Sequence, residues 1–386
     1  MKIFRAYKTE LDPNNNQRAI FVRCCGASRY VYNWGLAEWK RQYENGEKPS
    51  RYGLCKQFNA QKDNICPWIR DLPYAVVESS FANLGTAFEN FFRRIKNKAT
   101  KTGYPKFKKR GVKNGFQVRN TKIDSNQVRL TGAGWIQLKE RNYIPINVDK
   151  YGVYTTISER AGRWFISIMC EIDIPDPAPR LGNPLGVDVG IKSLAVLSDG
   201  TVFENPRALD QMQRKLKCLQ RELARRKTGS QNRNKTKAKI AKIYAKIVNV
   251  RQNATHNVSH KIINHTDADT IVLENLNVSG MIKNHHIAQA LTDASVSELH
   301  RQIDYKAGWA GVEVIRADRF YPSSKTCSSC GSIKPQLSLS EREFVCSDCG
   351  IVIDRDLNAA INLAALSEPL NGRGLPRELE CNNAPQ

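Results

Sequence analysis

Leu185-Gly-Val-Asp-Val-Gly-Ile191 is the stretch that decides the fold of the second half of the chain. In a β-strand, Val187 and the apolar residues at alternate positions fall on one face, while Asp188 and Gly190 fall on the other. An acid in a buried strand is costly unless it is compensated, and a bound metal ion is one compensation. Gly190 leaves room beside the acid for a substrate backbone. The stretch predicts a strand with a candidate metal-binding carboxylate, although so short a pattern also fits a purely structural acid.

A second acid ends another apolar stretch, Thr270-Ile-Val-Leu-Glu-Asn-Leu276. This stretch predicts a short strand whose last residue is Glu274. A carboxylate at the carboxyl end of a sheet strand points into the cleft where α/β proteins bind ligands. Glu274 is therefore the second candidate ligand, and a capping or salt-bridged glutamate is the alternative interpretation.

A third acid belongs to Asp354-Arg-Asp-Leu-Asn-Ala-Ala-Ile-Asn-Leu363, which predicts the start of a helix. The small side chains of Ala359 and Ala360 let that helix lie close to its neighbours. Asp356 can then reach a site shared with the other acids. Asp354, two residues earlier, is alternatively a helix cap.

A nuclease site of the RNase H type needs three acids: one on a first strand, one at the end of a later strand and one on a terminal helix. Two Mg²⁺ ions about 4 Å apart require hard oxygen ligands, and they activate water and bracket the scissile phosphate. Asp188, Glu274 and Asp356 are therefore the candidate catalytic residues and magnesium ligands. Such a site needs no covalent intermediate, so a Ser-His or Cys-His pair is not required.

Four cysteines carry the most specific signal in the chain. Cys327, Cys330, Cys346 and Cys349 form two C-x2-C pairs separated by fifteen residues, a spacing typical of a zinc ribbon. Because four thiolates leave no open coordination position, the pattern predicts one structural Zn²⁺ and not a catalytic one. Disulfides or another metal are the alternatives.

The charge of the chain points to a polyanionic partner. Its 386 residues carry 60 Lys and Arg against 37 Asp and Glu, a net charge of +23. Nucleic acid is the usual partner of such a surface, and an acidic membrane surface is the competing one. The longest strongly apolar run, Trp164 to Cys170, is too short to span a membrane, and the first ten residues lack the apolar core of a signal peptide. These features predict a cytoplasmic or nucleoid protein without a membrane partner.

Two segments concentrate this charge. Arg93–Lys113 holds ten Lys or Arg and no acid, interleaved with Tyr104 and Phe107, which favours contact with a phosphate backbone over a bland basic loop. Arg207–Lys261 holds sixteen against two acids, and its leucine and isoleucine spacing predicts an antiparallel helical hairpin with a basic outer face. The candidate nucleic-acid contacts are Arg93, Arg94, Lys106, Lys108, Lys109, Arg110, Arg225 and Arg226.

The first half of the chain alternates between strand and helix patterns. Ile3 to Leu11 predicts a strand, Asn14 to Gln17 opens a helix, and the pattern from about Ala19 to Phe92 is helical. Gly115 to Ile174 is rich in strand patterns. Four prolines follow, so we expect a domain boundary near residue 181.

The order of these motifs resembles that of the TnpB family, the RNA-guided nucleases of small insertion sequences and relatives of type V CRISPR effectors. The resemblance spans nearly the whole chain. Further matches to family signatures are Ser28-Arg-Tyr-Val-Tyr-Asn33, Asn90-Phe-Phe92, Gly103-Tyr-Pro-Lys-Phe107 and Phe320-Tyr-Pro-Ser-Ser324.

The resemblance implies an α/β fold of the RNase H/RuvC type, with an N-terminal β-barrel that carries a helical insertion, and with a zinc-ribbon insertion. It assigns Asp188, Glu274 and Asp356 to the RuvC-type active site, with Asp354 as a neighbour. The implied parts are the barrel (1–18 and 105–180), the helical recognition insertion (19–104), the RuvC-like domain (181–318 and 353–368), the ribbon (319–352) and a disordered tail (369–386).

The implied function is RNA-guided DNA cleavage by a protein of a transposable element. A guide RNA pairs with double-stranded target DNA, the protein recognises a short flanking DNA motif, and two metal ions support hydrolysis. The expected partners are guide RNA, target DNA and a separate transposase of the same element, in a prokaryotic cytoplasm. The alternatives are an RNA-guided DNA-binding regulator that does not cleave, which three intact acids disfavour, and a transposase or transposase accessory protein.

Overall fold

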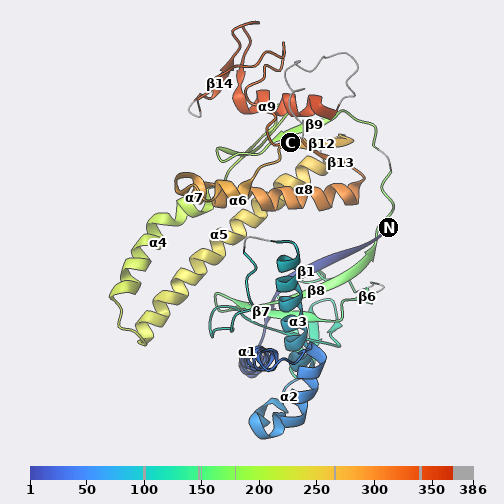
Figure 1. The fold of residues 1–386 in the computed structure, drawn as a ribbon, viewed down its shortest axis with the longest axis vertical. Coiled ribbons are helices and arrows are strands. Elements are labelled where there is room, and N and C mark those ends of the chain that lie inside the picture. Colours follow the sequence, from blue (N-terminus) through green and yellow to red (C-terminus); the bar gives the residue numbers. More distant parts are fainter. Residues whose placement is uncertain are drawn as a thin grey trace. The chain divides into compact units, whose positions relative to one another are not determined.

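The computed structural model describes residues 1–98, 101–146, 148, 150–178, 180–264, 267–338 and 341–367. The chain divides into two compact units, Met1–Pro175 and Asp176–Gln386, and the predicted boundary near residue 181 lies close to this division (Figure 1). The predicted tail, 369–386, lies outside the described residues. Within the described part, no helix is both long and apolar enough to cross a membrane.

Unit 1 begins with strand β1 (Lys2–Asp12) and continues with a set of helices. These are α1 (Asn15–Glu44), α2 (Arg51–Ile65), the 3₁₀ turn η1 (Pro67–Ile69) and α3 (Tyr74–Lys96). The predicted helix start is confirmed at Asn14, whose side chain accepts a hydrogen bond from the amide of Gln17. The side chain of Gln17 accepts one from the amide of Asn14 in return. This reciprocal capping box satisfies two amides at the beginning of α1.

The strands of unit 1 form one antiparallel sheet. Its strand order is β2-β7-β8-β1-β5-β4-β3, and β6 pairs with β8. The remaining strands are β2 (Asn114–Val118), β3 (Lys122–Ile123), β4 (Gln127–Leu130), β5 (Gly134–Leu138), β6 (Lys150–Tyr151), β7 (Thr155–Arg160) and β8 (Arg163–Asp173).

The expected closed barrel is not found, because among the described residues no ladder joins the outer strands β2 and β3. Strand β1 pairs with β8 along ten of its residues but with β5 only through Leu11 and Asp12. The strands β5, β4 and β3 therefore extend the sheet from one end of β1. Thr121, in the short connection between β2 and β3, donates from its Oγ1 to Thr155 Oγ1 on β7 at 2.8 Å.

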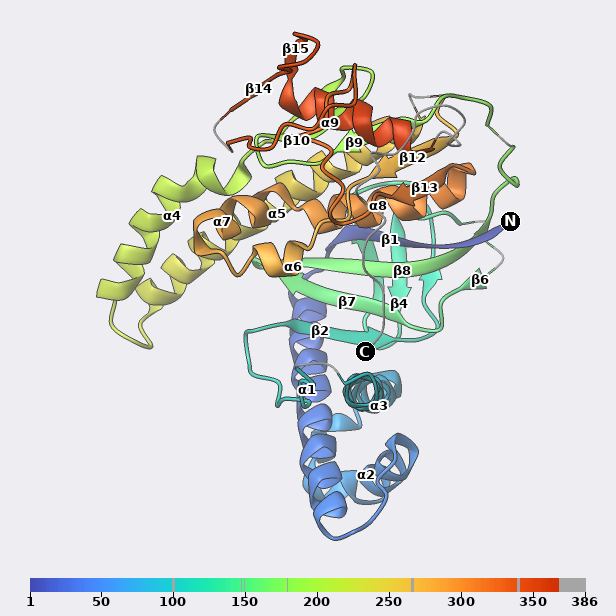
Figure 2. The same cartoon turned by 45° about the horizontal axis from the view of Figure 1, so that its top comes forward.

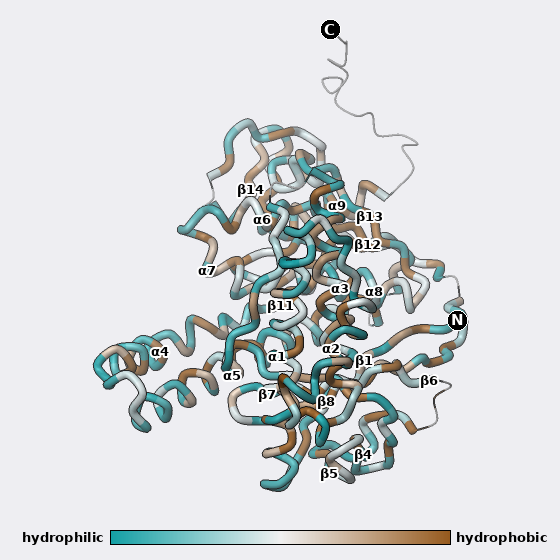
Figure 3. The backbone as a smooth tube through the Cα atoms, turned by 60° about the horizontal axis from the view of Figure 1, so that its bottom comes forward, coloured by the Kyte–Doolittle hydropathy of each residue, from teal (hydrophilic) through white to brown (hydrophobic). Residues whose placement is uncertain are grey.

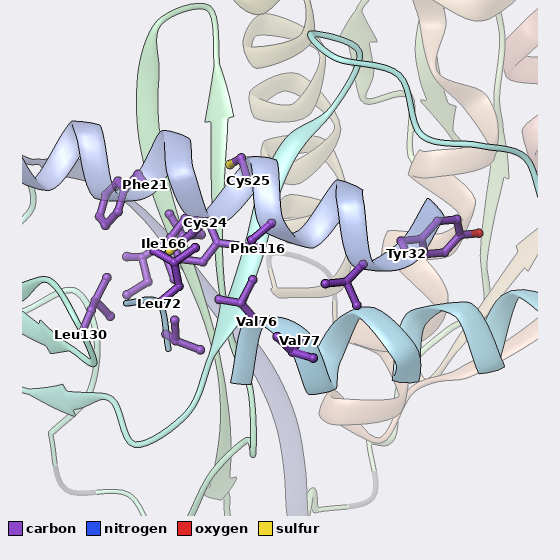
Figure 4. Close-up of a cluster of buried hydrophobic side chains, with 14 of the residues drawn as sticks. Phe21, Cys24, Cys25, Tyr32, Leu72, Val76, Val77, Phe116, Leu130 and Ile166 are labelled. Carbon is purple, nitrogen blue, oxygen red and sulfur yellow. The ribbon is translucent and has the colours of Figure 1, made fainter. Parts of the chain in front are cut away.

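Helices α1 and α3 cover the sheet of unit 1 through a large apolar core (Figure 4). Phe21 of α1 lies with its ring centroid 5.5 Å from that of Phe116 on β2 and 5.0 Å from that of Trp164 on β8. Cys24 also lies in this core, where burial raises the pKa of its thiol to about 12. The thiol is therefore protonated and unreactive at neutral pH.

Unit 2 is built on a five-stranded mixed sheet with the order β11-β10-β9-β12-β13. Strands β9, β12 and β13 are parallel, while β10 is antiparallel to both of its neighbours. The strands are β9 (Leu185–Asp188), β10 (Ser193–Leu197), β11 (Val202–Glu204), β12 (Thr270–Leu273) and β13 (Glu313–Arg316). Both predicted strands are confirmed, but β9 ends at its acid and β12 ends one residue before Glu274.

Helices cover both faces of this sheet (Figures 1 and 2). On one face, Val187 and Leu273 share a core with Ile262, Leu299 and Ile303 from helices α5 and α8. On the other face, α9 lies over β9 and β12. The helices of unit 2 are α4 (Ala208–Arg225), α5 (Gln231–Asn264), α6 (Val278–Met281), α7 (His285–Ala294), α8 (Val296–Ala310), α9 (Arg355–Ala364) and the 3₁₀ turn η2 (Ala365–Ser367).

The predicted helical hairpin is confirmed as α4 and the first half of α5. Leu216 and Leu219 of α4 pack against Ile243 and Ile247 of α5 in a small core of their own. Hydrophilic residues cover much of the rest of both helices (Figure 3). The hairpin is thus an amphipathic pair that projects from the sheet layers of unit 2.

Candidate active site and cysteine cluster

Strand pairing brings Asp188 and Glu274 to the same edge of the unit 2 sheet. Leu273 is the partner of Val187 in the parallel ladder between β12 and β9, so the next residue along each strand is one of the two acids. Side chains alternate between faces, and Val187 and Leu273 belong to the core on the side of α5 and α8. The two carboxylates therefore face the side of α9, and both are half-buried.

Helix α9 brings the third acid to this face because it lies unusually close to β9. A Cβ atom at Gly186 would lie 1.8 Å from the carbonyl oxygen of Ala360, so only glycine permits this approach. Ala359 and Ala360 are buried, as their small size predicted. Asp356 lies in the first turn of α9. Asp354 is the N-cap, because its side chain accepts from the amides of Asp356 and Leu357, which confirms the capping interpretation.

The three acids interact electrostatically. Burial, followed by the negative charges of Glu274 and Asp356, raises the pKa of Asp188 well above its ordinary value. A carboxyl group whose charged form is destabilised by neighbouring acids binds either a proton or a cation more readily. The predicted acids are thus brought together, as a cluster that favours added positive charge.

A loop that follows β13 holds Glu274 in place. Ser323 is buried, and its Oγ donates to Glu274 Oε1 at 2.7 Å. Asn362 of α9 donates to the carbonyl oxygens of Ser323 and Thr326, at 2.8 and 2.7 Å. Asn358, one helical turn earlier, also donates to the carbonyl oxygen of Thr326. The helix that carries Asp356 therefore also fixes the loop that orients Glu274.

The sequence patterns considered above did not predict this role of Ser323, Asn358 and Asn362. The one available signal is the spacing of the two asparagines, four residues apart on a helix whose other buried positions are apolar. A buried amide needs hydrogen-bond partners, so such a pair indicates a polar anchor.

The four predicted cysteines converge, with their sulfur atoms within 4.8 Å of one another. Among the described residues, they are the single group of three or more ligating side chains that meets this closely. The closest sulfur pairs, Cys327 with Cys349 and Cys330 with Cys346, are 3.6 Å apart, and all four thiols are free. The disulfide alternative is therefore not found in this arrangement.

Two matching turns present the cysteines. In the first, Gly331 donates its amide proton to the carbonyl of Cys327, and in the second, Gly350 donates to Cys346. Both glycines have positive φ angles, 79° and 73°, which close each turn. The second turn connects the paired strands β14 (Glu343–Val345) and β15 (Val352–Asp354), and α9 follows β15 directly. A hydrogen bond with Ser332 lowers the pKa of Cys346 to about 6, which favours the thiolate that binds metal.

Some of the candidate nucleic-acid-binding side chains already interact with other residues of the protein, and others do not. Arg226 pairs with Glu222, and the Nζ atom of Lys108 lies 4.0 Å from the ring centroid of Tyr32. Arg93 donates to Asn90, and Arg94 donates to the carbonyl of Thr102. The other four are exposed and form no ion pair within the described part of the chain: Lys106, Lys109, Arg110 and Arg225.

Comparison with known proteins identifies the family. Three family models match, described as "Helix-turn-helix domain" (residues 1–48), "Probable transposase" (167–285) and "Cas12f1-like, TNB domain" (297–363). A protein of Streptomyces pristinaespiralis, named as a candidate RNA-guided DNA endonuclease, is 32% identical over 393 residues, covering 99% of this chain and 94% of the relative. The chain belongs to the TnpB family.

Other relatives extend the comparison. InsQ of Escherichia coli (strain K12), also named as a candidate RNA-guided DNA endonuclease, is 31% identical over 386 residues, covering 95% of the chain and 92% of InsQ. A chain of a solved Cas12f1–sgRNA–target DNA complex is 16% identical with a TM-score of 0.36, covering 94% of this chain and 99% of that one. In this TnpB protein, the residues matched by the helix-turn-helix model form strand β1 and helix α1.

Proposed function

We propose that this TnpB protein is an RNA-guided DNA endonuclease of a transposable element. Guide RNA and double-stranded target DNA are its partners, and a short flanking DNA motif completes recognition. Two relatives that match almost the whole chain are named as candidate RNA-guided DNA endonucleases, which supports the proposal. We place the protein in the prokaryotic cytoplasm, and in the nucleoid when it is bound to DNA. Its DNA substrate and its net charge of +23 suit this location.

The observation that carries the proposal is the acidic cluster. The ladder that makes Leu273 the partner of Val187 sets Glu274 beside Asp188, and the approach of α9 at Gly186 brings Asp356 to them. The order β11-β10-β9-β12-β13, with β10 alone antiparallel, supports an RNase H/RuvC-like nuclease domain. In this domain Asp188, Glu274 and Asp356 are the catalytic residues.

These carboxylates suit Mg²⁺. They are hard oxygen ligands on one face of a sheet, and their mutual repulsion, visible in the raised pKa of Asp188, is relieved by a divalent cation. Two Mg²⁺ ions held here supply a Lewis acid and an activated water molecule for phosphodiester hydrolysis. Ser323 keeps Glu274 oriented through its hydrogen bond, and Asp354 fixes the first turn of α9 on which Asp356 lies.

The cysteine cluster binds one structural Zn²⁺. Four sulfurs on two matching turns suit tetrahedral coordination, and no position remains open for substrate. Because the hairpin from the second turn runs directly into α9, the zinc ribbon (319–352) stabilises the approach to Asp356. Its loss is therefore expected to disturb the nuclease site.

The basic segments grip nucleic acid. Lys106, Lys109, Arg110 and Arg225 are the freest of the eight candidate side chains and make the main phosphate contacts. The helical insertion (19–104) and the sheet of unit 1 (1–18 and 105–180) hold the guide RNA and its duplex with the target. The RuvC-like domain (181–318 and 353–368) cuts the DNA, and a separate transposase acts on the same element.

The second candidate function, guided binding of DNA without cleavage, has less support. A protein that only binds has no need to keep two further acids beside Asp188, whose pKa they raise, and here the arrangement is supported by Gly186, Ser323 and Asn362. A role as transposase accessory has no specific support from the site.

The proposal is tested by expressing the protein with its native locus and sequencing the RNA that copurifies. A DNA target that matches this RNA, with randomised flanking sequence, is then incubated with the complex in Mg²⁺. We expect one RNA species and cleavage confined to targets with one flanking motif. The absence of a specific RNA, or equal cleavage of unmatched DNA, contradicts the proposal.

A further inference from the structure

A pocket of about 550 Å³ opens beside the acidic cluster of unit 2. Its charged lining residues are the acids Glu204, Asp354 and Asp356 and the cations Lys192 and Arg207, and Asn205 is one of its neutral polar residues. Val196 and Leu357 add apolar surface to the lining. Its volume lies within the range of ~300–1,000 Å³ that is usual for small-ligand pockets. Asp356 belongs both to this pocket and to the acidic cluster, whereas Asp188 and Glu274 are not among its lining residues.

The two cations of the pocket are available to a ligand. Arg207 is exposed and forms no ion pair with any other described residue. Lys192 Nζ lies 4.0 Å from Asp354 Oδ2, at the limit of an ion pair, and both side chains are about half exposed, at 49% and 48%. Such a pair gains little from its mutual attraction in water. An anion with several acceptor oxygens can therefore recruit both cations.

The backbone around Arg207 is held in an unusual conformation. Its φ angle is +45°, a left-handed value that non-glycine residues rarely adopt. Asn205 Oδ1 accepts a hydrogen bond from the Arg207 amide at 3.0 Å, and Asn205 Nδ2 donates to the carbonyl of Ile191 at 2.7 Å. Asn205 thus ties the beginning of α4 to the residue before Lys192.

The beginning of α4 is anchored from a second side. The Leu209 amide donates to the carboxylate of Asp293, at 3.0 and 3.1 Å to its two oxygens, and Asp293 is buried and paired with Arg251. These contacts fix the backbone of α4 two residues after Arg207. Strain maintained by such surroundings often accompanies a functional position.

We propose that Lys192 and Arg207 bind a phosphodiester of the DNA strand next to the one that is cut, which makes the pocket a nucleotide subsite. This inference rests on the proposed function, since the strand is its substrate. A strand that passes the pocket brings negative charge toward Glu204, Asp354 and Asp356, and the two cations of the same lining offset part of that repulsion. Arg207 can bind a phosphate through two donors, while Lys192 acts as a point charge.

The first test compares cleavage with binding in the full-length protein loaded with its guide RNA. Lys192→Gln and Arg207→Gln should each slow single-turnover cleavage by about tenfold, and together by about a hundredfold. Guided DNA affinity in EDTA should change by less than about twofold, because most contacts lie elsewhere. Lys192→Arg and Arg207→Lys should recover most of the rate, which a purely structural defect does not predict.

Lys283→Gln is the matched control, because Lys283 is an exposed lysine of the same unit that does not line the pocket. Its cleavage rate should equal that of the wild type. Wild-type cleavage by the double glutamine variant overturns the inference. An equal loss of guided DNA affinity and cleavage also overturns it, since the residues then do not act locally at the site.

The second test does not depend on cleavage. The metal-free protein is acetylated with and without a single-stranded thymidine oligonucleotide, and the modified lysines are identified by mass spectrometry. We expect the oligonucleotide to protect Lys192 but not Lys283. Protection in a preparation that cuts no guided target supports the subsite while the proposed function fails. Guided cleavage without protection, and without an effect of the glutamine variants, leaves the proposed function intact and overturns the subsite.

Discussion

At the level of single residues, the candidate active site depends on a few positions where an ionisable group is held by tight packing. Asp188 lies at the end of a strand beside two other acids, and its raised pKa records the cost of that placement. The sequence predicts all three acids as candidate ligands, because each lies beside apolar residues, where an uncompensated carboxylate is costly. It was not sufficient to predict Ser323, whose hydrogen bond to Glu274 depends on a loop that is distant in sequence.

The raised pKa of Asp188 gives a pH-dependent prediction for metal-free protein. Because the folded-state pKa lies above the unfolded one, the folded protein holds the proton more tightly between the two values, and stability falls as pH rises through that window. Asp188→Asn removes the charge and should raise the melting temperature by a few degrees at pH 8. The difference should vanish near pH 3, where the wild-type carboxyl is protonated.

Thermal unfolding in EDTA across this pH range measures the effect. Glu313→Gln is a suitable control, since Glu313 is an exposed acid on the edge of the same sheet. It should alter stability by less than about 0.5 kcal/mol. A melting temperature that is lower in Asp188→Asn than in the wild type at pH 8 would show that the charge of Asp188 does not destabilise the folded protein.

At the scale of elements, the position of α9 decides whether the site forms. The helix was predictable from its apolar stripe of Leu357, Ile361 and Ala364, and Ala359 and Ala360 predicted a close approach to its neighbours. The need for glycine at position 186 could not be predicted, because it depends on the contact with Ala360 of α9. The barrel that the resemblance implied was not found for the described strands: β2 and β3 form opposite edges of the sheet without a ladder between them, although only residues 119–121 separate them in sequence.

Gly186→Ala tests the contact between α9 and β9. The added methyl group would lie 1.8 Å from the carbonyl oxygen of Ala360, so the helix must move away. We expect a loss of roughly 2 kcal/mol or more in the free energy of unfolding, and a larger loss of cleavage than of guided binding. In Gly308→Ala, on α8, a Cβ atom meets nothing within 4 Å, so the same change should be neutral or stabilising. Equal stability of the two variants, by chemical denaturation, contradicts the packing argument.

The cysteine ribbon makes a separate prediction at this scale. Elemental analysis should find one zinc per chain in the wild type and almost none after the double change Cys346→Ser and Cys349→Ser, which removes one turn of the site. Cys218→Ser, an exposed cysteine on α4 outside the cluster, should keep the metal. Full zinc content in the double variant is the result that rules the cluster out as the zinc site.

At the level of the whole chain, the basic and the acidic side chains are concentrated in different segments, and the net charge is +23. Basic side chains line the loop after α3 and the hairpin of α4 and α5, while acids gather at the edge of the unit 2 sheet. The sequence predicted both basic segments but not which side chains are already engaged. The pair of Glu222 and Arg226 is an exception, since its spacing of four on a helix is visible in the sequence.

The basic segments predict a strong dependence of RNA binding on salt. If about six to ten phosphates are contacted, affinity should fall by about a thousandfold or more between 50 and 200 mM salt. Lys109→Gln with Arg110→Gln should make the dependence shallower, because two exposed cations are removed. Arg301→Gln, which removes a cation already paired with Glu298, should leave the slope unchanged. An affinity for RNA that is insensitive to salt is incompatible with a phosphate-gripping surface.

The assignment of the acidic cluster as the active site is tested by the single-turnover rate of guided DNA cleavage in Mg²⁺ by Asp188→Ala, measured beside guided binding of the same target. The acidic cluster predicts that cleavage falls by at least about a hundredfold while guided affinity stays near that of the wild type. Cleavage at the wild-type rate by this variant would show that the cluster of Asp188, Glu274 and Asp356 is not the active site.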